Sequence, residues 1–398
     1  MLKKRGTKQT GFFANNKLLI AITTLIGTIV GAGILGIPYA IAKVGFFWGF
    51  IIIVTLGLCF ILINLFAGEM ILRTKKQHQL TGYAQKYLGK WGKIVMTLVM
   101  LMSLYGALIA YLIGEGSTLY AIFGFGSPLI YTLIFFAITS YIIFSGIKAT
   151  GKTELVLISL LIIIVFVIGV FSYRSMDFSR LLTSNITNFL LPYGIVLFAY
   201  MALPAIPELQ EVIGKEKKLL KKAIIWGSVI PIIIYLFFAA VVVGAVGLEN
   251  FELLDTNQRI ATIALSIYSN KILGVFANIL AVLAMFTSYL TIGIALTEMY
   301  EYDYKLNRKL ALSLTFFIPL IVVLFNLTSF LTVLAITGAI AGGLEAVMVM
   351  LMYWRAKKLG DRKPEYTMPN FYVLGGIILV MFLIGSIYQF IITLVWKL

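Results

Sequence analysis

The chain has little charge, one cysteine and one histidine. Asp, Glu, Lys and Arg make up 12% of its 398 residues, about half the share of a typical soluble protein. The single cysteine, Cys59, excludes a disulfide within the chain. The single histidine, His78, lies in a basic stretch, which excludes a histidine relay inside an apolar segment. Without converging His, Cys and Asp groups we expect no enzymatic activity and no protein-held metal.

Apolar residues dominate instead. They make up 61% of the chain, and its mean hydropathy is +1.01. Apolar residues make up roughly 45–50% of soluble domains, so the composition indicates a polytopic membrane protein. No soluble domain of useful size accompanies the apolar runs, and a nucleotide-driven pump is not expected.

About 20 apolar residues span a bilayer as a helix, and the longest run divides at a turn between Asn326 and Ser329. We predict an all-α protein with 11 transmembrane helices, at residues 18–42, 45–72, 94–123, 127–147, 155–173, 189–212, 223–246, 272–300, 310–325, 329–354 and 371–396.

The basic residues alternate with these spans. The net charge is +16, and 26 of the 32 Lys and Arg fall in the N-terminal segment and in every second loop. Basic loops stay in the cytoplasm. We therefore predict a multi-pass protein of the cell membrane, with the N-terminus cytoplasmic and the C-terminus outside. The charge orients the helices, so no nucleic acid is predicted as a partner, and no protein partner is evident.

Two segments outside the spans also suggest helices. Residues 80–93 mix aromatic and basic side chains, which suits an amphipathic helix at the membrane surface. Residues 256–268 fit a short helix that caps an entrance. An ordinary connector is the alternative for each.

The first span contains a break. Gly27, Gly31, Gly33, Gly36 and Pro38 lie within twelve residues at mid-depth. Gly costs about 1 kcal/mol and Pro about 3 kcal/mol in a helix interior. Broken backbone in hydrocarbon is tolerated only where it is buried in protein or lines a watery cavity. The break therefore predicts a binding site.

The sixth span repeats this pattern with Pro192, Gly194, Pro204 and Pro207. Paired broken helices in the two halves of a chain indicate a transporter's site. The two breaks are five spans apart, so the second half is inverted relative to the first. We predict five segments: a cytoplasmic N-terminal segment (1–17), a first five-helix repeat (18–173), a second, inverted repeat (189–354), a cytoplasmic loop (355–370) and an eleventh helix (371–396).

At these residues the chain resembles the amino acid–polyamine–organocation (APC) superfamily, with the LeuT-type 5+5 inverted-repeat fold. The similarity rests on Gly27–Pro38 with Tyr39 and Ala40, on residues 198–200 and 204–208, and on residues 287–290. It is closest to the amino acid/auxin permease or aromatic amino acid permease branch. The resemblance implies an ion-coupled symporter for neutral amino acids, aromatic or aliphatic ones among them. The alternative is an amino acid sensor or exchanger of the same fold.

The broken helices suit both charges of an amino acid substrate. Free N–H groups at a helix start attract a carboxylate, and free carbonyls at a helix end attract an ammonium. We assign the carboxylate to Gly31, Ala32, Gly33 and Ile34. We assign the ammonium to Ile26, Gly27, Thr28, Phe198, Ala199 and Tyr200. We expect the substrate's side chain to be selected by Tyr200, Met201, Leu203, Tyr105, Ala110 and Tyr111.

A coupling ion, Na⁺ or H⁺, is the only cofactor expected. Ala284, Thr287 and Ser288 share one helix face. In LeuT-type sodium symporters this spacing, with carbonyls matching Gly27 and Val30, holds Na⁺. The alternative is that the hydroxyls bond back to their own helix.

Intramembrane acids are functional candidates, and Glu345 and Glu115 are the possible proton carriers. Glu208 and Glu69 are expected to pair with basic residues near the cytoplasmic face. For Glu115, an outward-reaching side chain is the alternative.

Overall fold

A computed structural model describes residues 16–146, 151–269, 271–302 and 304–396. These residues form helices and connecting turns and contain no β-strand, as predicted for an all-α protein. The α-helices are α1 (Lys17–Ile29), α2 (Gly33–Val44), α3 (Phe46–Leu72), α4 (Leu80–Phe123), α5 (Pro128–Phe144), α6 (Gly151–Ser172), α7 (Tyr193–Tyr200), α8 (Ala205–Ile213), α9 (Leu219–Glu252), α10 (Ala261–Tyr268), α11 (Lys271–Tyr302), α12 (Arg308–Leu324), α13 (Phe330–Ile336), α14 (Gly343–Leu359) and α15 (Tyr372–Trp396). The shorter turns are η1 (Tyr173–Ser175), η2 (Phe178–Leu182), η3 (Ile186–Asn188), η4 (Thr256–Gln258) and η5 (Thr337–Gly342).

Each of the eleven predicted spans contains helix. Within the described residues, eight helical segments are long and apolar enough to cross a membrane, and the bent pair α1–α2 makes a ninth. The helices α5 and α12 have 17 residues each, fewer than the roughly 20 that span a bilayer untilted. The count of eleven and the inverted repeat therefore remain predictions.

Both predicted helix breaks are present. The axes of α1 and α2 differ by 54°, and the chain between them runs through Val30, Gly31 and Ala32. The sixth span stops at Tyr200 and restarts at Ala205. Proline lacks the N–H that would continue the earlier hydrogen bonds, and Pro204 stands directly before the restart. Local sequence thus determines where both helices break.

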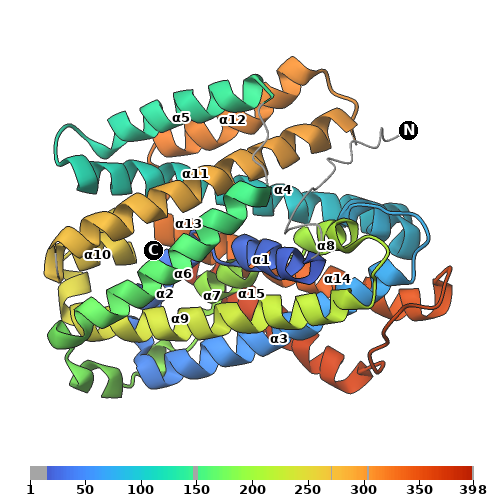
Figure 1. Cartoon of the computed structure of the whole chain (residues 1–398), viewed down its shortest axis with the longest axis horizontal. Helices are drawn as coiled ribbons and strands as arrows, with labels where there is room; N and C mark the ends of the chain where they lie inside the picture. Colours follow the sequence, from blue (N-terminus) through green and yellow to red (C-terminus); the bar gives the residue numbers. More distant parts are fainter. Residues whose placement is uncertain (1–15, 147–150, 270, 303, 397–398) are drawn as a thin grey trace.

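The helices form two groups around the broken pair. In Figure 1, α3 and α9 run side by side along one edge, while α5, α11 and α12 lie along the other. The short pieces α1, α2, α7 and α8 lie between these edges (Figure 1). The helix breaks are therefore enclosed by long helices on both sides.

Ion pairs cross the helices at both ends of the bundle. At one end, called here the basic end, Lys17 pairs with Glu216 at 2.8 Å and Lys86 pairs with Asp361. At the opposite end, Lys43 pairs with Glu252 at 2.5 Å. The predicted cytoplasmic loops lie at the basic end, but the orientation in a membrane remains a prediction.

The connecting segments refine the predicted helices. Residues 80–93 are helical but bend at Gly89, whose φ is +76°, and Trp91 is 78% exposed. The predicted helix over 256–268 is present as two shorter pieces, η4 and α10, separated by Arg259 and Ile260. The tenth span carries an unpredicted π-helical turn, η5. Such turns occur often at functional sites.

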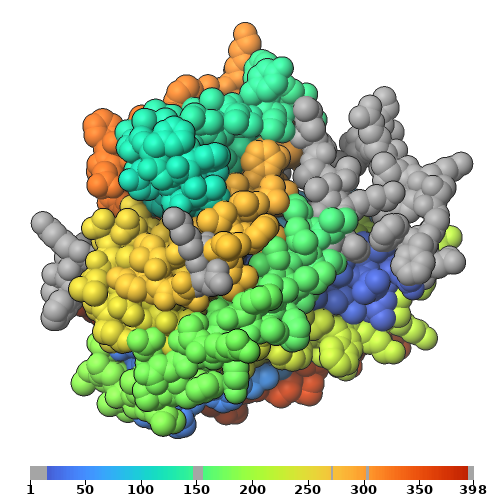
Figure 2. Space-filling view, turned by 60° about the vertical axis from the view of Figure 1, so that its left-hand side comes forward, coloured from blue at the N-terminus to red at the C-terminus, as the bar shows by residue number. Residues whose placement is uncertain are grey.

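The surface of α6 is apolar. Figure 2 shows this helix, in green, crossing one face of the molecule beside the gold α11. Its exposed side chains include Ile163, Phe166 and Val170. An exposed apolar helix of this length suits contact with lipid tails.

Candidate functional site

A cavity of about 170 Å³ lies where the two broken helices meet. Helices α1, α2, α4, α7, α8, α11 and α14 contribute to its wall. Of the residues predicted to bind substrate, six line it: Thr28, Gly31, Ala32, Gly33, Phe198 and Met201.

The other predicted substrate residues lie around the cavity rather than in its wall. Ile26 is buried, and its carbonyl accepts the N–H of Val30 at 2.7 Å. Ile34 and Ala199 are also buried, and Gly27 lines a neighbouring cavity. None of these residues is among those that line the central cavity.

Tyr200 points away from the central cavity. Its hydroxyl donates to the carbonyl of Ile53 on α3 at 3.1 Å, and its ring stacks on Phe60. Tyr105 also points elsewhere, because its hydroxyl contacts Tyr300 at 2.7 Å. Tyr111 and Met201 do line the cavity, so the predicted selectivity set is reduced to these two. Leu203 and Ala110 are buried outside it.

The cavity opens toward the basic end. Four of its wall residues are exposed: Thr28, Glu208, Thr291 and Ala295. Toward the opposite end, α2 packs tightly on α7, because a Cβ on Gly33 would lie 2.5 Å from the Cα of Ala199. The exposed part of the wall therefore faces the basic end, and the close contact of α2 with α7 lies on the opposite side.

All five predicted ion-site residues line one neighbouring cavity of about 100 Å³: Gly27, Val30, Ala284, Thr287 and Ser288. The hydroxyl of Thr287 also donates to the carbonyl of Ala284 at 3.0 Å, which is the back-bonding expected as the alternative. The side chain of Tyr111 forms part of both this cavity and the central one. The ion role itself remains a prediction.

Tyr235 of α9 contacts both helix breaks, and the sequence analysis did not single it out. It is fully buried, and its hydroxyl oxygen lies 2.7 Å from the carbonyl of Ile29 at the end of α1. It also lies 2.7 Å from the carbonyl of Ala199 in the last turn of α7. A lone tyrosine in the run that follows Pro231 was the available clue.

The two predicted proton carriers differ in location. Glu345 of α14 is 1% exposed and lines the central cavity. Glu115 of α4 is fully buried, so its side chain does not reach the surface. Neither carboxylate has a hydrogen-bond partner within the described part of the chain. Of the two, Glu345 is the one that lines the central cavity.

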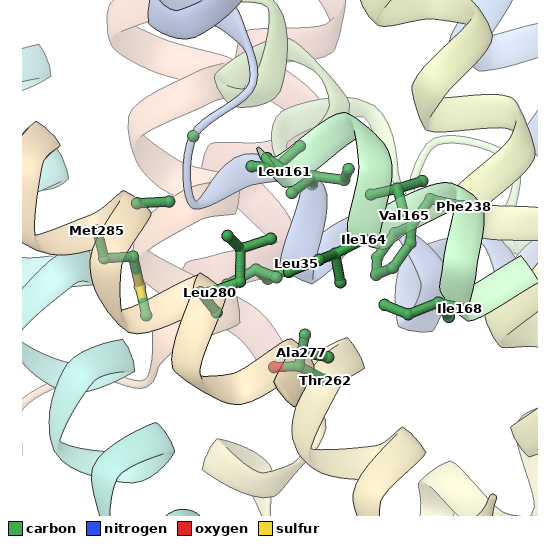
Figure 3. Close-up of a pocket in the computed structure, with 14 residues that line it drawn as sticks. Leu35, Leu161, Ile164, Val165, Ile168, Phe238, Thr262, Ala277, Leu280 and Met285 are labelled. Atoms are coloured by element: carbon green, nitrogen blue, oxygen red, sulfur yellow. The ribbon is translucent and has the colours of Figure 1, made fainter. Parts of the chain in front are cut away.

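An apolar cavity of about 30 Å³ adjoins the helix break at Gly31. Figure 3 shows side chains of α6, including Leu161 and Val165, and of α11, including Leu280, directed into it. Thr262 of α10 contributes its only polar lining side chain. The predicted capping helix thus covers an apolar space beside the break.

One stretch, residues 146–153, has the G-x-x-x-x-G-K-T spacing of a phosphate-binding loop. That motif cradles phosphate between a β-strand and a helix. Here the flanking elements are the helices α5 and α6, and residues 147–150 lie outside the described residues. The described flanks of this stretch therefore lack the strand-to-helix setting of that motif.

Paired helix breaks around a central cavity, in an apolar helical protein, define a membrane transporter. Residues 14–394 match the tryptophan/tyrosine permease family, and the chain belongs to that family. It is an amino acid transporter and not an enzyme.

Named relatives cover most of the chain. The tyrosine-specific transport system 1 of Haemophilus influenzae is 26% identical over 372 residues, which cover 88% of this chain and 90% of that protein. The glutamine transporter 2 of Aliivibrio fischeri is 25% identical over 91% of this chain and 95% of its own length. The low affinity tryptophan permease of Escherichia coli is 24% identical over 75% of this chain and 77% of its own length.

Solved structures share the fold. MhsT in complex with L-phenylalanine aligns with a TM-score of 0.63 at 17% identity, over 94% of this chain and 98% of that chain. A mutant manganese transporter of Eremococcus coleocola aligns with a TM-score of 0.68 at 12% identity, over 96% of this chain and 88% of that chain. At these identities the likeness shows the LeuT-type fold alone.

Proposed function

We propose that this chain moves neutral amino acids, aromatic ones in particular, across the cell membrane together with a cation. The observation that carries the proposal is the central cavity at the meeting point of two broken helices. The named relatives act on tyrosine, glutamine and tryptophan. The side chains of these three amino acids carry no net charge.

The backbone at the breaks suits the shared part of every amino acid. The first N–H groups of a helix have no partner within it, and the start of α2 at Ala32 and Gly33 lines the cavity. A substrate carboxylate fits there. Thr28 and Phe198, near the ends of α1 and α7, bring helix-end carbonyls toward the ammonium.

The charge of the wall argues against an acidic side chain on the substrate. The carboxylates in the wall belong to Glu208 and Glu345, and neither Lys nor Arg is among the lining residues. An acidic substrate side chain would meet like charge without a compensating cation. Tyr111 and Met201 supply the apolar contacts that an aromatic ring needs.

For the coupling cation we propose Na⁺ in the cavity formed by Gly27, Val30, Ala284, Thr287 and Ser288. Carbonyl and hydroxyl oxygens suit a hard cation. Glu345 supports a proton as the second candidate, because its buried carboxylate faces the substrate cavity without a partner.

Access alternates in this proposal by rocking of two helix groups. One group contains α1, α2, α3, α7, α8 and α9, and the other contains α4, α5, α11 and α12. With the basic end in the cytoplasm, the open cavity corresponds to an inward-facing state.

Uptake into proteoliposomes tests the proposal. Labelled tyrosine, tryptophan, phenylalanine and glutamine are each offered with an inward Na⁺ gradient, an inward H⁺ gradient, and neither. Uptake driven by Na⁺ supports the Na⁺ site. Uptake driven only by H⁺ overturns that site and favours Glu345, in which case Glu345→Gln abolishes accumulation but keeps exchange.

Two other outcomes contradict the proposal. Exchange of internal for external amino acid, without accumulation under either gradient, supports an exchanger in its place. Failure of all four amino acids to enter by uptake or exchange contradicts the substrate class.

A further inference from the structure

The Tyr235 hydroxyl joins the two broken helices at their centres. Its oxygen lies 2.7 Å from the carbonyl oxygen of Ile29 and 2.7 Å from that of Ala199. These carbonyls belong to different helices, α1 and α7, and Tyr235 comes from a third, α9. The tyrosine is fully buried.

Both carbonyls can accept a hydrogen bond from Tyr235 because their helices break at this point. In a continuous helix each carbonyl accepts from the N–H four residues later. At the end of α1 the carbonyl of Ile29 instead accepts the N–H of Gly31 at 2.9 Å, in addition to Tyr235. Unpaired helix-end carbonyls inside a protein are costly, so the phenol stabilises the broken form of both helices.

One hydroxyl serves two acceptors here. A phenol carries a single proton, so it donates fully to one carbonyl at a time or shares the proton between both. The two carbonyl oxygens can therefore lie no farther apart than one hydroxyl reaches. This contact fixes the spacing between the ends of α1 and α7.

We propose that Tyr235 is a positioning residue that sets the geometry of the substrate's amino-group site. The inference rests on the proposed function, in which carbonyls at the ends of α1 and α7 hold the ammonium. Ile29 itself lines the central cavity. The phenol holds these helix ends in place from behind, without touching the substrate.

The chain offers a matched control. Tyr200 is also buried, and its ring centroid lies 5.2 Å from that of Tyr235. Its hydroxyl donates to Ile53, in the interior of α3. A carbonyl in a helix interior keeps its own helical partner, so Tyr200→Phe removes the same atom without freeing a helix end.

The test measures transport kinetics of wild type, Tyr235→Phe and Tyr200→Phe in proteoliposomes. Competition by the deaminated acid, which keeps the carboxylate and ring but lacks the ammonium, is measured alongside. We expect Tyr235→Phe to raise the KM for the amino acid at least tenfold and to leave inhibition by the deaminated acid within twofold. Tyr200→Phe is expected to leave both within twofold.

Equal changes for both ligands, or equal changes in both variants, would overturn the inference and indicate a general packing role. Folding of each variant is checked by thermal unfolding in detergent. If wild type transports amino acids and Tyr235→Phe behaves as Tyr200→Phe does, the inference fails while the proposed function stands. If wild type transports none of the four amino acids, the proposed function fails first.

Discussion

Glu69 on α3 and Lys357 on α14 form an ion pair of 2.9 Å inside the basic end of the bundle. Glu69 is fully buried and also accepts from Arg73 at 2.8 Å and from the backbone N–H of Met368 at 2.5 Å. The carboxylate therefore ties α3, α14 and the loop before α15 together. The predicted pairing of Glu69 with basic residues is confirmed.

Replacing this carboxylate should destabilise the fold. Removing one partner of a buried ion pair costs about 3–5 kcal/mol, because the remaining charge stays buried and uncompensated. We expect Glu69→Gln to lower the free energy of unfolding by that amount. Denaturant unfolding in detergent measures it. The control is Glu216→Gln, which breaks the more exposed Lys17 pair and should cost at most about 1 kcal/mol. Equal losses in both variants would contradict the prediction.

The loop before α15 is held at a second point by Asp361. Its backbone N–H donates to the carbonyl of Arg73 at 2.8 Å, and its carboxylate pairs with Lys86. The Lys86 hydrogen bond holds the pKa of Asp361 below its ordinary value of 3.8. A depressed carboxyl pKa means that the tie is present at neutral pH and is lost as the pH falls through the lowered pKa.

Hydrogen exchange tests this tie. In wild type, the amides of Asp361 and Arg362 should remain protected from neutral pH down to about pH 4, allowing for the intrinsic pH dependence of exchange. Asp361→Asn should remove that protection at every pH. Glu365→Gln, which breaks only the local pair with Arg362, is the control. Full protection in Asp361→Asn would show that the ion pair is not what holds the loop.

A close helix contact at Gly33 should be essential for transport. A Cβ at this position would lie 2.5 Å from the Cα and 2.7 Å from the Cβ of Ala199. Overpacking of this kind costs about 1–3 kcal/mol and shifts the backbone. We expect Gly33→Ala to reduce uptake at least tenfold by moving α2 away from α7.

Gly376 on α15 provides the comparison for Gly33. A Cβ there would meet no atom within 4 Å, and Ala favours a helix over Gly by about 1 kcal/mol. Gly376→Ala should therefore transport normally at equal expression. Normal transport by Gly33→Ala would show that α2 and α7 need not approach so closely.

The proposed Na⁺ site predicts a change in cation dependence rather than in substrate recognition. Ser288→Ala and Thr287→Ala each remove one hydroxyl oxygen from the cavity beside α1. We expect each to raise the half-saturating Na⁺ concentration at least tenfold, because a hard cation loses a ligand. Uptake over a Na⁺ series at saturating amino acid measures this.

Thr297 of α11 is the matched residue for that test. Its hydroxyl bonds to Gly293 at 2.8 Å and contacts Thr315 of α12, away from the cavity. Thr297→Ala should leave the Na⁺ dependence unchanged. An unchanged dependence in Thr287→Ala and Ser288→Ala as well would remove the site from consideration.

The sequence was most informative where the cause is local. Gly and Pro act on their own stretch of backbone, so the breaks near Gly31 and Pro204 are predictable without knowledge of the fold. Apolar runs likewise identify helices, although α5 and α12 turn out shorter than the rest. The direction in which a side chain points depends on neighbouring helices. Tyr200 was therefore expected at the cavity, yet it points to α3.

By itself, the sequence determined that the protein is an apolar helical bundle with two broken spans, because hydropathy and helix propensity are properties of consecutive residues. Only the tertiary structure decided which distant atoms meet. The contact of Tyr235 with both Ile29 and Ala199 joins residues up to 206 positions apart, and Glu69 meets Met368 across 299 positions. Such contacts arise from the packing of whole helices, and no short stretch of sequence encodes them.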